Sequence, residues 1–535
     1  MNFILNNLNK IKYFTNKICM DENVQRYINY NKKKWANYKI KKTKGVIMVD
    51  LFDHPPFIHF WSYIVNFLLK KYSLKSEYFY FTFYKSFFSE FQLYLNKIKK
   101  NYLSFNVTEG INEQNFKYSK KDISHAKIDF NKIKNKVRLQ EYKYKNIKIG
   151  DLIYDTYLRT TFQPTINIKD KYLFKIFLRA RKIFDKINEY FDKRNVKLVI
   201  PSHTYYIQYG LLVRLANIRK IPIIIIHNKA RGNKDFRLKI LNQIFPTEHN
   251  DGYINYSKTF RSLNKYKKKL ALKLGESNLK SRLDGKSKLS YLKNSPYKGL
   301  IKKKFITNNQ KKNVIIFAHD FFDAPHRFRN MIFTDFYEQL KFFISISKQY
   351  SNWNWFIKPH PNHLKDNDII FKNLKENNKN VLFLDQKTNN YQIIKNNPKF
   401  IITNNGTIAH EFAFFKIPVI NTGDNPHINY SFNLHPKNLD ELKNMISKID
   451  YYKKKINFNK KKIYEFVYMH YIHNKNYKIN SLIKDNFFLT KNFSFNATSK
   501  LYSILLNNNK NDKYIIEYLE NFFETNKKEL KLSLL

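Results

Sequence analysis

Short apolar runs and longer amphipathic stretches alternate along the first half of the chain. The apolar run 45–50 is separated by a turn with two prolines from an amphipathic stretch that reaches residue 72. A short apolar run bounded by turn residues is typical of a buried strand, whereas apolar positions three and four apart favour a helix. On the same criteria, strands are expected at 78–84, 196–200 and 221–226, and helices at 172–191 and about 204–219.

The same alternation begins again at residue 313. Strands are expected at 313–320, 353–361, 381–385, 399–403 and 418–421, with helical segments between them. Strands that alternate with helices form parallel β-α-β units, whose binding sites lie at the carboxyl ends of the strands. The pattern therefore predicts an α/β protein with two Rossmann-like lobes, a cleft between them and a helical C-terminal extension.

Two segments interrupt this alternation. Residues 101–147 are polar and poorly periodic, which predicts a loosely structured insertion in the first lobe. Residues 257–312 are rich in Lys, Ser and Asn, which is typical of a connection between lobes. The expected organisation is an N-terminal extension (1–44), a first lobe (45–256), a basic linker (257–312), a second lobe (313–440) and a helical basic extension (441–535), in which 463–472 is an amphipathic helix.

Length and cysteine content agree with a two-lobed protein in a reducing compartment. The chain of 535 residues is longer than one hydrophobic core usually supports. Its single cysteine, Cys19, excludes an intramolecular disulfide and a multi-cysteine zinc site. The first 14 residues lack the pattern of a signal peptide, and the longest apolar runs, 57–69 and 221–227, are shorter than the roughly 20 residues that cross a bilayer. We expect a cytoplasmic protein that is soluble or peripherally attached to the inner face of the membrane.

The strongly basic charge allows more than one partner. The chain has 98 Lys and Arg against 42 Asp and Glu, a formal charge of +56. Such a charge attracts polyanions, anionic lipid and phosphorylated substrates, although codon bias toward A and T also enriches Lys, Asn, Ile, Phe and Tyr. One alternative is a basic nucleic-acid-binding protein that uses runs such as 451–464, but no recognised nucleic-acid motif is present and Lys is spread along the chain. Another is that the tail 451–535 contacts an anionic membrane.

The turn after the strand at 399–403 is the most informative chemical motif. Gly406 permits close backbone approach, and a helix that begins at Thr407 offers free N–H groups to a phosphate. Glu411 lies four residues after Thr407, on the same helix face, where its carboxylate can accept two hydrogen bonds from a ribose diol. The plain alternative is an ordinary helix cap followed by a Glu that faces solvent.

A second motif ends the strand at 353–361. The prolines of Lys358-Pro359-His360-Pro361 prevent continuation as a helix and direct Lys358 and His360 into the crevice. There His360 can donate to a phosphate oxygen or give a proton to a leaving phosphate, and Lys358 supplies positive charge.

A third group follows the first strand of the second lobe. His319, Asp320, Asp323 and His326 superficially offer metal ligands. The preferred interpretation is a loop that faces the cleft, where Arg327 and Arg329 bind a phosphate or an acidic sugar. No metal site is expected.

These motifs together resemble the donor lobe of capsule polysaccharide and related surface-carbohydrate glycosyltransferases. The matching elements are the strand that ends in 358–361, the pattern T-x-x-G-T-x-x-x-E at 403–411 and Pro-Val-Ile at 418–420, with fainter similarity at 148–155 and 202–216. The resemblance covers about 45–440. It implies a GT-B fold, a CMP-, UDP- or GDP-linked sugar in the second lobe, no cofactor and no obligatory metal. Residues Phe415 and Lys416 stand where related enzymes often have Gly.

The donor-site residues expected from the motifs and the resemblance are Lys358, Asn405, Gly406, Thr407, Glu411, His319 and Arg327, with His360 as a catalytic group. The acceptor is expected to approach from the first lobe, whose strand ends offer candidates for a general base. These candidates are Asp50, Asp53, His54, Asp155 and His203, with Asp53 and His54 preferred. Asp151 and Asp155 lie on one face if their segment is helical, and either bind acceptor hydroxyls or form a salt bridge with Arg159.

The leading hypothesis is a metal-independent glycosyltransferase of hexosyl or Kdo type that acts on a glycan or lipid-linked acceptor. Another enzymatic alternative is a sugar-nucleotide epimerase or a polyol-phosphate transferase, because both can use two lobes with similar phosphate-binding turns.

Overall fold

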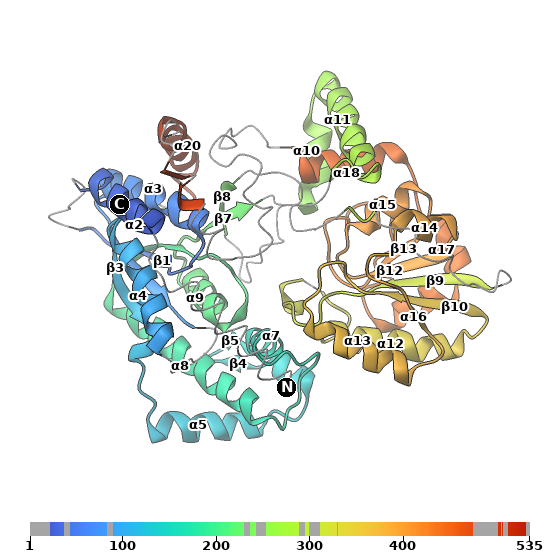
Figure 1. Cartoon of the computed structure of the whole chain (residues 1–535), viewed down its shortest axis with the longest axis horizontal. Coiled ribbons are helices and arrows are strands. Elements are labelled where there is room, and N and C mark those ends of the chain that lie inside the picture. Colours follow the sequence, from blue (N-terminus) through green and yellow to red (C-terminus); the bar gives the residue numbers. More distant parts are fainter. Residues whose placement is uncertain are drawn as a thin grey trace.

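The computed structural model describes residues 22–36, 43–82, 89–228, 236–241, 253–287, 295–298, 311–328, 330–473, 501–503, 505–506 and 512–530. Cys19, Arg329 and residues 474–500 of the basic tail lie outside the described residues. The described part forms two α/β lobes (Figure 1).

Four parallel strands form the sheet of the first lobe, in the order β3-β2-β1-β6. Their bounds are β1 Val46–Asp50, β2 Lys75–Tyr80, β3 Val107–Asn112 and β6 Val196–Ile200. All five residues of β1 are buried, as expected for a parallel strand covered on both faces. The strand predicted at 196–200 has the observed bounds.

Helices cover both faces of this sheet. One layer contains α2 Glu22–Lys34, α3 Pro55–Tyr72 and α4 Ser89–Leu103, and the other contains α7 Gly150–Thr161, α8 Lys171–Lys193 and α9 Tyr206–Ile218. Ile47 and Val49 point into the core under the first layer, whereas Val46 and Met48 point into the core under the second. This alternation follows from the two-residue period of a strand. The predicted helices at 172–191 and 204–219 are confirmed.

The prediction of a loose insertion at 101–147 is wrong. This segment contains β3, η1 Glu113–Asn115, α5 Lys120–Asn131, α6 Lys136–Gln140, β4 Lys143–Tyr144 and β5 Ile147–Lys148. Glu113 is buried and accepts hydrogen bonds from Arg179 Nε at 2.8 Å and from the Thr82 amide at 3.0 Å, so it ties the end of β3 to α8. The segment looked irregular because β3 is an edge strand with two exposed positions, and because its burial depends on ion pairs.

The strand predicted at 221–226 pairs differently from its neighbours. It forms β7 Ile224–Asn228, which pairs antiparallel with β8 Phe236–Ile240. A single parallel bridge between Val199 and Ile223 connects this two-stranded ribbon to β6.

Five parallel strands form the sheet of the second lobe, in the order β11-β10-β9-β12-β13. Their bounds are β9 Lys312–Phe317, β10 Trp353–Lys358, β11 Leu382–Phe383, β12 Phe400–Thr403 and β13 Val419–Asn421. The associated helices are η3 Pro325–Arg327, α12 Phe336–Gln349, α13 Asp366–Asn377, α14 Asn390–Lys395, α15 Ile408–Phe414, α16 Leu439–Ser447 and α17 Ile449–Lys455. The predicted succession of strands and helices is confirmed, and with it the two Rossmann-like lobes.

A helical subassembly packs on the second lobe. It contains η2 Tyr253–Asn255, α10 Tyr256–Ser262 and α11 Lys265–Leu283, all within or next to the segment assigned to a lobe connection, together with α18 Lys460–Tyr471. A Cβ at Gly275 would lie 2.1 Å from the Tyr464 carbonyl oxygen, so glycine is what lets α11 cross α18 this closely. The amphipathic helix predicted at 463–472 is confirmed by α18.

The end of the chain returns to the first lobe. Helix α20 Asp512–Thr525 lies beside α3 in Figure 1, and Ile515, Leu519 and Phe523 belong to the core that α3 also lines. Tyr502 accepts a hydrogen bond from Asn101 Nδ2 at 3.0 Å in the same region. Within the described residues, no helix combines the length and apolar character needed to cross a membrane.

Contacts between the lobes are both apolar and polar. The rings of Phe162 and Phe322 pack edge to face with centroids 5.4 Å apart. Asp335, at the start of α12, accepts hydrogen bonds from Tyr154 Oη at 2.5 Å and from Thr165 Oγ1 at 2.6 Å. Lys136 donates to Glu338 Oε1 at 2.6 Å. These contacts orient the carboxyl edges of the two sheets, at which the site described next is found.

Candidate active site

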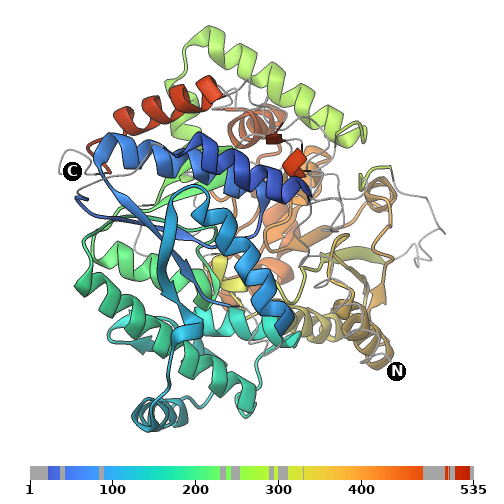
Figure 2. The same cartoon turned by 60° about the vertical axis from the view of Figure 1, so that its left-hand side comes forward.

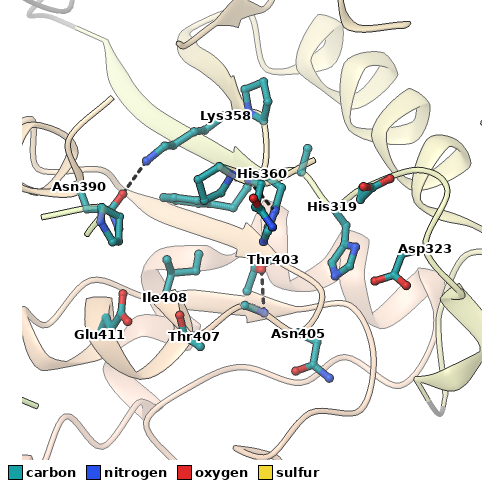
Figure 3. Close-up of a pocket in the computed structure, with 18 of the residues that line it drawn as sticks. His319, Asp323, Lys358, His360, Asn390, Thr403, Asn405, Thr407, Ile408 and Glu411 are labelled. Carbon is teal, nitrogen blue, oxygen red and sulfur yellow. Dashed lines mark hydrogen bonds between the residues drawn. The ribbon is translucent and has the colours of Figure 1, made fainter. Parts of the chain in front are cut away.

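A cavity of about 360 Å³ lies at the carboxyl ends of β9, β10 and β12 (Figure 3). All eight residues expected in the second-lobe site line it: His319, Arg327, Lys358, His360, Asn405, Gly406, Thr407 and Glu411. Along the sequence, the first and the last of them, His319 and Glu411, are 92 positions apart. Parallel packing brings them together because every strand of the sheet ends at the same edge.

The turn between β12 and α15 is held by its own side chains. The Gly406 amide donates to Thr403 Oγ1 at 3.2 Å, and a Cβ at Gly406 would lie 2.6 Å from that oxygen. Asn405 Nδ2 reaches the Asp424 carbonyl at 3.4 Å, while its buried Oδ1 has no hydrogen-bond partner. The turn therefore places a small residue at the cavity, beside a buried amide oxygen that lacks a hydrogen-bond partner.

Glu411 is neither a cap residue nor a solvent-facing one. Its side chain is buried, with Oε1 accepting from Arg282 Nε at 2.9 Å and Oε2 from Tyr297 Oη at 2.7 Å. Burial raises the pKa of Glu411, but Arg282, His410 and Tyr297 more than offset that effect and hold the pKa below its usual value. Glu411 is thus an ionised group at the cavity wall, with lone pairs left over for a further donor.

Neither Arg282 nor Tyr297 is predicted from the sequence. Both lie in the segment assigned to a lobe connection, more than 100 positions before Glu411. Arg282 is 8% exposed and lines the cavity, and its Nη1 has no hydrogen-bond partner. A buried guanidinium with an unsatisfied N–H is a ready donor to an anionic or carbonyl oxygen.

Lys358 lies at the back of the same cavity. Its Nζ donates to the Thr388 carbonyl at 2.7 Å and to Asn390 Oδ1 at 2.6 Å, as Figure 3 shows for Asn390. Burial lowers the pKa of Lys358 to about 7, although Glu411 and Asp385 oppose the shift. Lys358 therefore changes charge near neutral pH, which differs from the constant positive charge expected from the sequence.

Replacing Lys358 with Met is expected to change how stability depends on pH. Between pH 7 and the ordinary lysine value of 10.5, the unfolded chain binds one proton more than the folded chain at this position, so the contribution of Lys358 to stability rises with pH. The free energy of unfolding of Lys358→Met minus that of the wild type should fall by up to about 1.4 kcal/mol per pH unit across this window. Urea titrations at pH 7, 8 and 9 measure it.

The control is Lys372→Met, because the Lys372 side chain is 74% exposed. Its difference from the wild type should stay flat over the same pH range. An equally flat difference for Lys358→Met would contradict the depressed pKa of the buried amine.

Two imidazoles face each other across the cavity. The ring centroids of His319 and His360 are 5.8 Å apart, and His319 stacks on Phe336. His360 Nδ1 accepts from the Asn362 amide at 3.1 Å, which leaves the proton of the neutral ring on Nε2. Burial and the neighbouring His319 lower the pKa of His360 to about 3. At neutral pH His360 is thus a hydrogen-bond donor through Nε2, not a protonated acid.

The loop after β9 supplies a charged pair and no metal site. Asp323 forms an ion pair with Arg327 at 2.9 Å, and Arg327 lines the cavity. Asp320 instead accepts hydrogen bonds from the amides of Phe322 and Leu364, both at 3.0 Å. Over the described ranges, no group of three or more His, Cys, Asp or Glu side chains is placed to hold a metal ion.

A second cavity, of about 330 Å³, lies between the lobes beside the first. Arg327 and Phe328 line both cavities, and Asp151, Asp155, Thr204 and Tyr205 line the second from the first lobe. Asp151 and Asp155, which were expected to meet the acceptor, thus line one space, and His203 is not among its lining residues.

Both carboxylates of α7 that line this cavity are paired. Asp151 accepts hydrogen bonds from both terminal nitrogens of Arg214 at 2.6 Å, and Asp155 Oδ1 contacts His326 Nδ1 at 2.6 Å across the lobes. Burial raises the pKa of Asp155 to about 6. The partners in the structure are therefore Arg214 and His326, where the sequence suggested Arg159.

Asp53 and His54 lie outside both cavity linings. His54 is the residue before α3 and makes no capping hydrogen bond with its side chain. Its ring stacks on Phe52 and contacts Phe57 edge to face. Neither residue is among those that line the two cavities.

The ends of β1 and β6 bring three polar side chains into one chain of hydrogen bonds. Ser202 Oγ contacts Asp50 Oδ2 and lies 2.9 Å from His203 Nδ1. Burial raises the pKa of Asp50 to about 7 and lowers that of His203 to about 4. The His203 ring contacts Tyr205, which lines the second cavity and over which Arg327 is placed, whereas His203 is not among the residues that line either cavity. Ser202 is the member of the relay that is not predicted from the sequence.

No family model and no curated protein sequence matches this chain. Similar solved structures include UDP-GlcNAc 2-epimerase from Neisseria meningitidis bound to UDP-GlcNAc (12% identity, 79% of this chain and 97% of that chain, TM-score 0.24). They also include Thermosulfurimonas dismutans KpsC, a beta Kdo 2,4 transferase (10%, 51% and 79%, 0.34), and CalG4, the Calicheamicin Glycosyltransferase (10%, 80% and 96%, 0.23). At these values the similarities concern the fold and carry no function over to this chain.

Proposed function

We propose that this protein is a glycosyltransferase that moves a sugar from a nucleotide to an acceptor during synthesis of a capsule or other surface polysaccharide. The observation that carries the proposal is the cavity of the second lobe, in which cationic, imidazole, amide and carboxylate groups converge. A nucleoside diphosphate requires this combination: cations and N–H donors for the phosphates, and a carboxylate for the ribose diol.

The charges of the cavity suit a diphosphate. Arg282 and Arg327 are each paired with a carboxylate, Glu411 and Asp323 respectively, so they are held in place before a ligand arrives. Lys358 gains a proton easily near neutral pH, and a bound phosphate would favour its charged form. The Nε2–H of His360 and the free Nη1 of Arg282 supply directed donors. These groups neutralise the departing phosphate without a metal ion.

On the acceptor side, we place the general base at His203, in preference to Asp53 and His54. The reason is that Ser202 orients its ring and that Tyr205, which the ring contacts, lines the second cavity. Its Nε2 takes the proton of an acceptor hydroxyl while the oxygen forms a bond with the anomeric carbon. The bond from that carbon to the phosphate oxygen breaks, and the nucleotide leaves with the electron pair. Asp50 and Ser202 hold the ring of His203 through Nδ1, and the second cavity gives the acceptor glycan a place beside the donor.

Thermal stabilisation by nucleotides tests the donor site. The melting temperature should be compared with CMP, UDP, GDP, dTDP and their sugars over a range of concentrations. At about 100 times its dissociation constant, a ligand that binds one site adds about 2.7 kcal/mol of stability. One nucleotide is expected to raise the melting temperature by several degrees, and Asn405→Ala should weaken that shift, because Asn405 lines the cavity. The absence of a shift with every nucleotide would contradict the proposal.

Product analysis separates transfer from epimerisation. A transferase releases free nucleotide only when an acceptor is present, whereas an epimerase converts the nucleotide sugar without releasing the nucleotide. Conversion of the sugar in the absence of acceptor would favour the epimerase.

A further inference from the structure

Helix α11 carries an apolar stripe on its outer face. The helix forms part of the outer edge of the molecule in Figure 1 and its upper edge, in light green, in Figure 2. Its inner face, with Ala271 and Gly275, packs against α18. On the opposite face, Tyr266, Leu270 and Leu274 are 75%, 44% and 39% exposed. Their spacing of four residues aligns them along the helix.

Lysines border this stripe on both sides. At 100° per residue, Lys267 lies on one side of the stripe, and Lys269, Lys273 and Lys280 lie on the other. All four are exposed. Glu276 is the single acidic residue of α11, and it is paired with Lys280 at 2.9 Å. From Tyr266 to Leu274 the outer face is therefore apolar along its centre and positive along its margins, and beyond Leu274 the centre line continues with Ser277 and Ser281.

We propose that α11 docks this protein on the surface of an anionic lipid membrane, with Tyr266, Leu270 and Leu274 inserted among the headgroups and acyl chains. Interfacial helices combine an apolar stripe with flanking lysines, because the stripe leaves water while the lysines contact lipid phosphates. A nucleic acid would neutralise the lysines but leave the leucines in water. A second copy of α11 would bring lysines against lysines.

Helix α11 also connects the proposed membrane-binding stripe with the donor cavity. Arg282, which holds Glu411, belongs to the last turn of α11. Tyr266 and Arg282 are 16 positions apart, which corresponds to about 24 Å along the helix at 1.5 Å per residue. Membrane docking of α11 thus keeps the cavity close to the lipid surface, and, if the proposed glycosyl transfer holds, within reach of a lipid-linked acceptor.

Sedimentation of the full-length protein with lipid vesicles tests whether the outer face of α11 binds a membrane. Phosphatidylcholine vesicles with and without 30% phosphatidylglycerol should be compared for the wild type, a stripe variant with Tyr266, Leu270 and Leu274 each changed to Ser, and a margin variant with Lys267, Lys269 and Lys273 each changed to Gln. We expect the wild type to bind only the anionic vesicles. The stripe variant should bind at least about tenfold more weakly, and the margin variant roughly fivefold more weakly per lysine removed. Ile128→Ser on α5, where Ile128 is 56% exposed, is the matched control and should bind like the wild type.

Three outcomes would overturn the proposal. In the first, the stripe variant binds anionic vesicles as the wild type does, which would mean that the net charge alone attracts the protein. In the second, the wild type binds neither type of vesicle. In the third, the stripe variant changes the oligomeric state in solution and leaves vesicle binding intact, which would make this face an interface between copies. The melting temperature of each variant shows that it is folded, and the nucleotide-induced shift reports on the donor site separately.

Discussion

Glu411→Ala is expected to lower the free energy of unfolding by about 3–5 kcal/mol, because it removes one partner of a buried ion pair and leaves the other without compensation. The Arg282 side chain is 9% exposed and the Glu411 side chain 1% exposed. Without the carboxylate, the Arg282 guanidinium and the Tyr297 hydroxyl, both of which are buried, lose their acceptor. Urea unfolding at pH 7 measures the loss.

Two further variants show whether the lost charge is the cause. Glu376→Ala removes a carboxylate that is 60% exposed and should stay within about 0.5 kcal/mol of the wild type. Adding Arg282→Met to Glu411→Ala removes the orphaned charge and should recover part of the stability. A loss below about 1 kcal/mol in the single variant would show that Arg282 reaches solvent without Glu411.

The central strands of both lobes were predictable because they are buried on both faces. β6 and β9 are nearly continuous apolar runs that end in polar turns, and such runs identify central parallel strands without knowledge of their partners. The cavity residues of the second lobe were predictable for the same reason. Once the strands are placed, residues that directly follow β10 and β12, such as His360 and Gly406, must meet at one edge.

Features that depend on distant partners were not predictable. β3 is an edge strand, and its end is fixed by Glu113 and Arg179, which are 66 positions apart. Arg282 and Tyr297 look like part of a polar linker until the fold brings them to Glu411. No local periodicity or motif in a single sequence encodes such pairs.

The turn before the Pro-Val-Ile strand has an unusual backbone conformation. Lys416, the second residue of the Phe415-Lys416 pair in this turn, has a φ of 59°. This left-handed conformation favours glycine, since a side chain is strained there.

His203→Ala is expected to reduce kcat by about 10²- to 10⁴-fold, the usual contribution of a general base. The nucleotide-induced rise in melting temperature should be unchanged, because His203 is not among the residues that line the donor cavity. His125→Ala on α5, which alters an exposed imidazole of the same lobe, is the control and should keep wild-type kcat. A wild-type kcat in His203→Ala would contradict the assignment of His203 as the general base and leave Asp53 and His54 as the candidates.

The pH dependence of kcat distinguishes a relay from a lone histidine. Above pH 7 the ionised Asp50 accepts the Ser202 hydroxyl proton, Ser202 Oγ accepts from His203 Nδ1–H, and Nε2 is left free to take a proton. Below pH 7 the protonated Asp50 donates to Ser202, which then donates to Nδ1 and leaves the proton on Nε2, the wrong tautomer for a base. Activity should therefore fall as the pH drops through about 7, although the pKa of His203 is near 4, lowered by burial and by the nearby Arg327, His54 and Arg159.

Asp50→Asn and Ser202→Ala should each lower kcat and remove this limb of the profile. If the limb persists unchanged in both variants, its cause lies in another group and His203 acts without the relay.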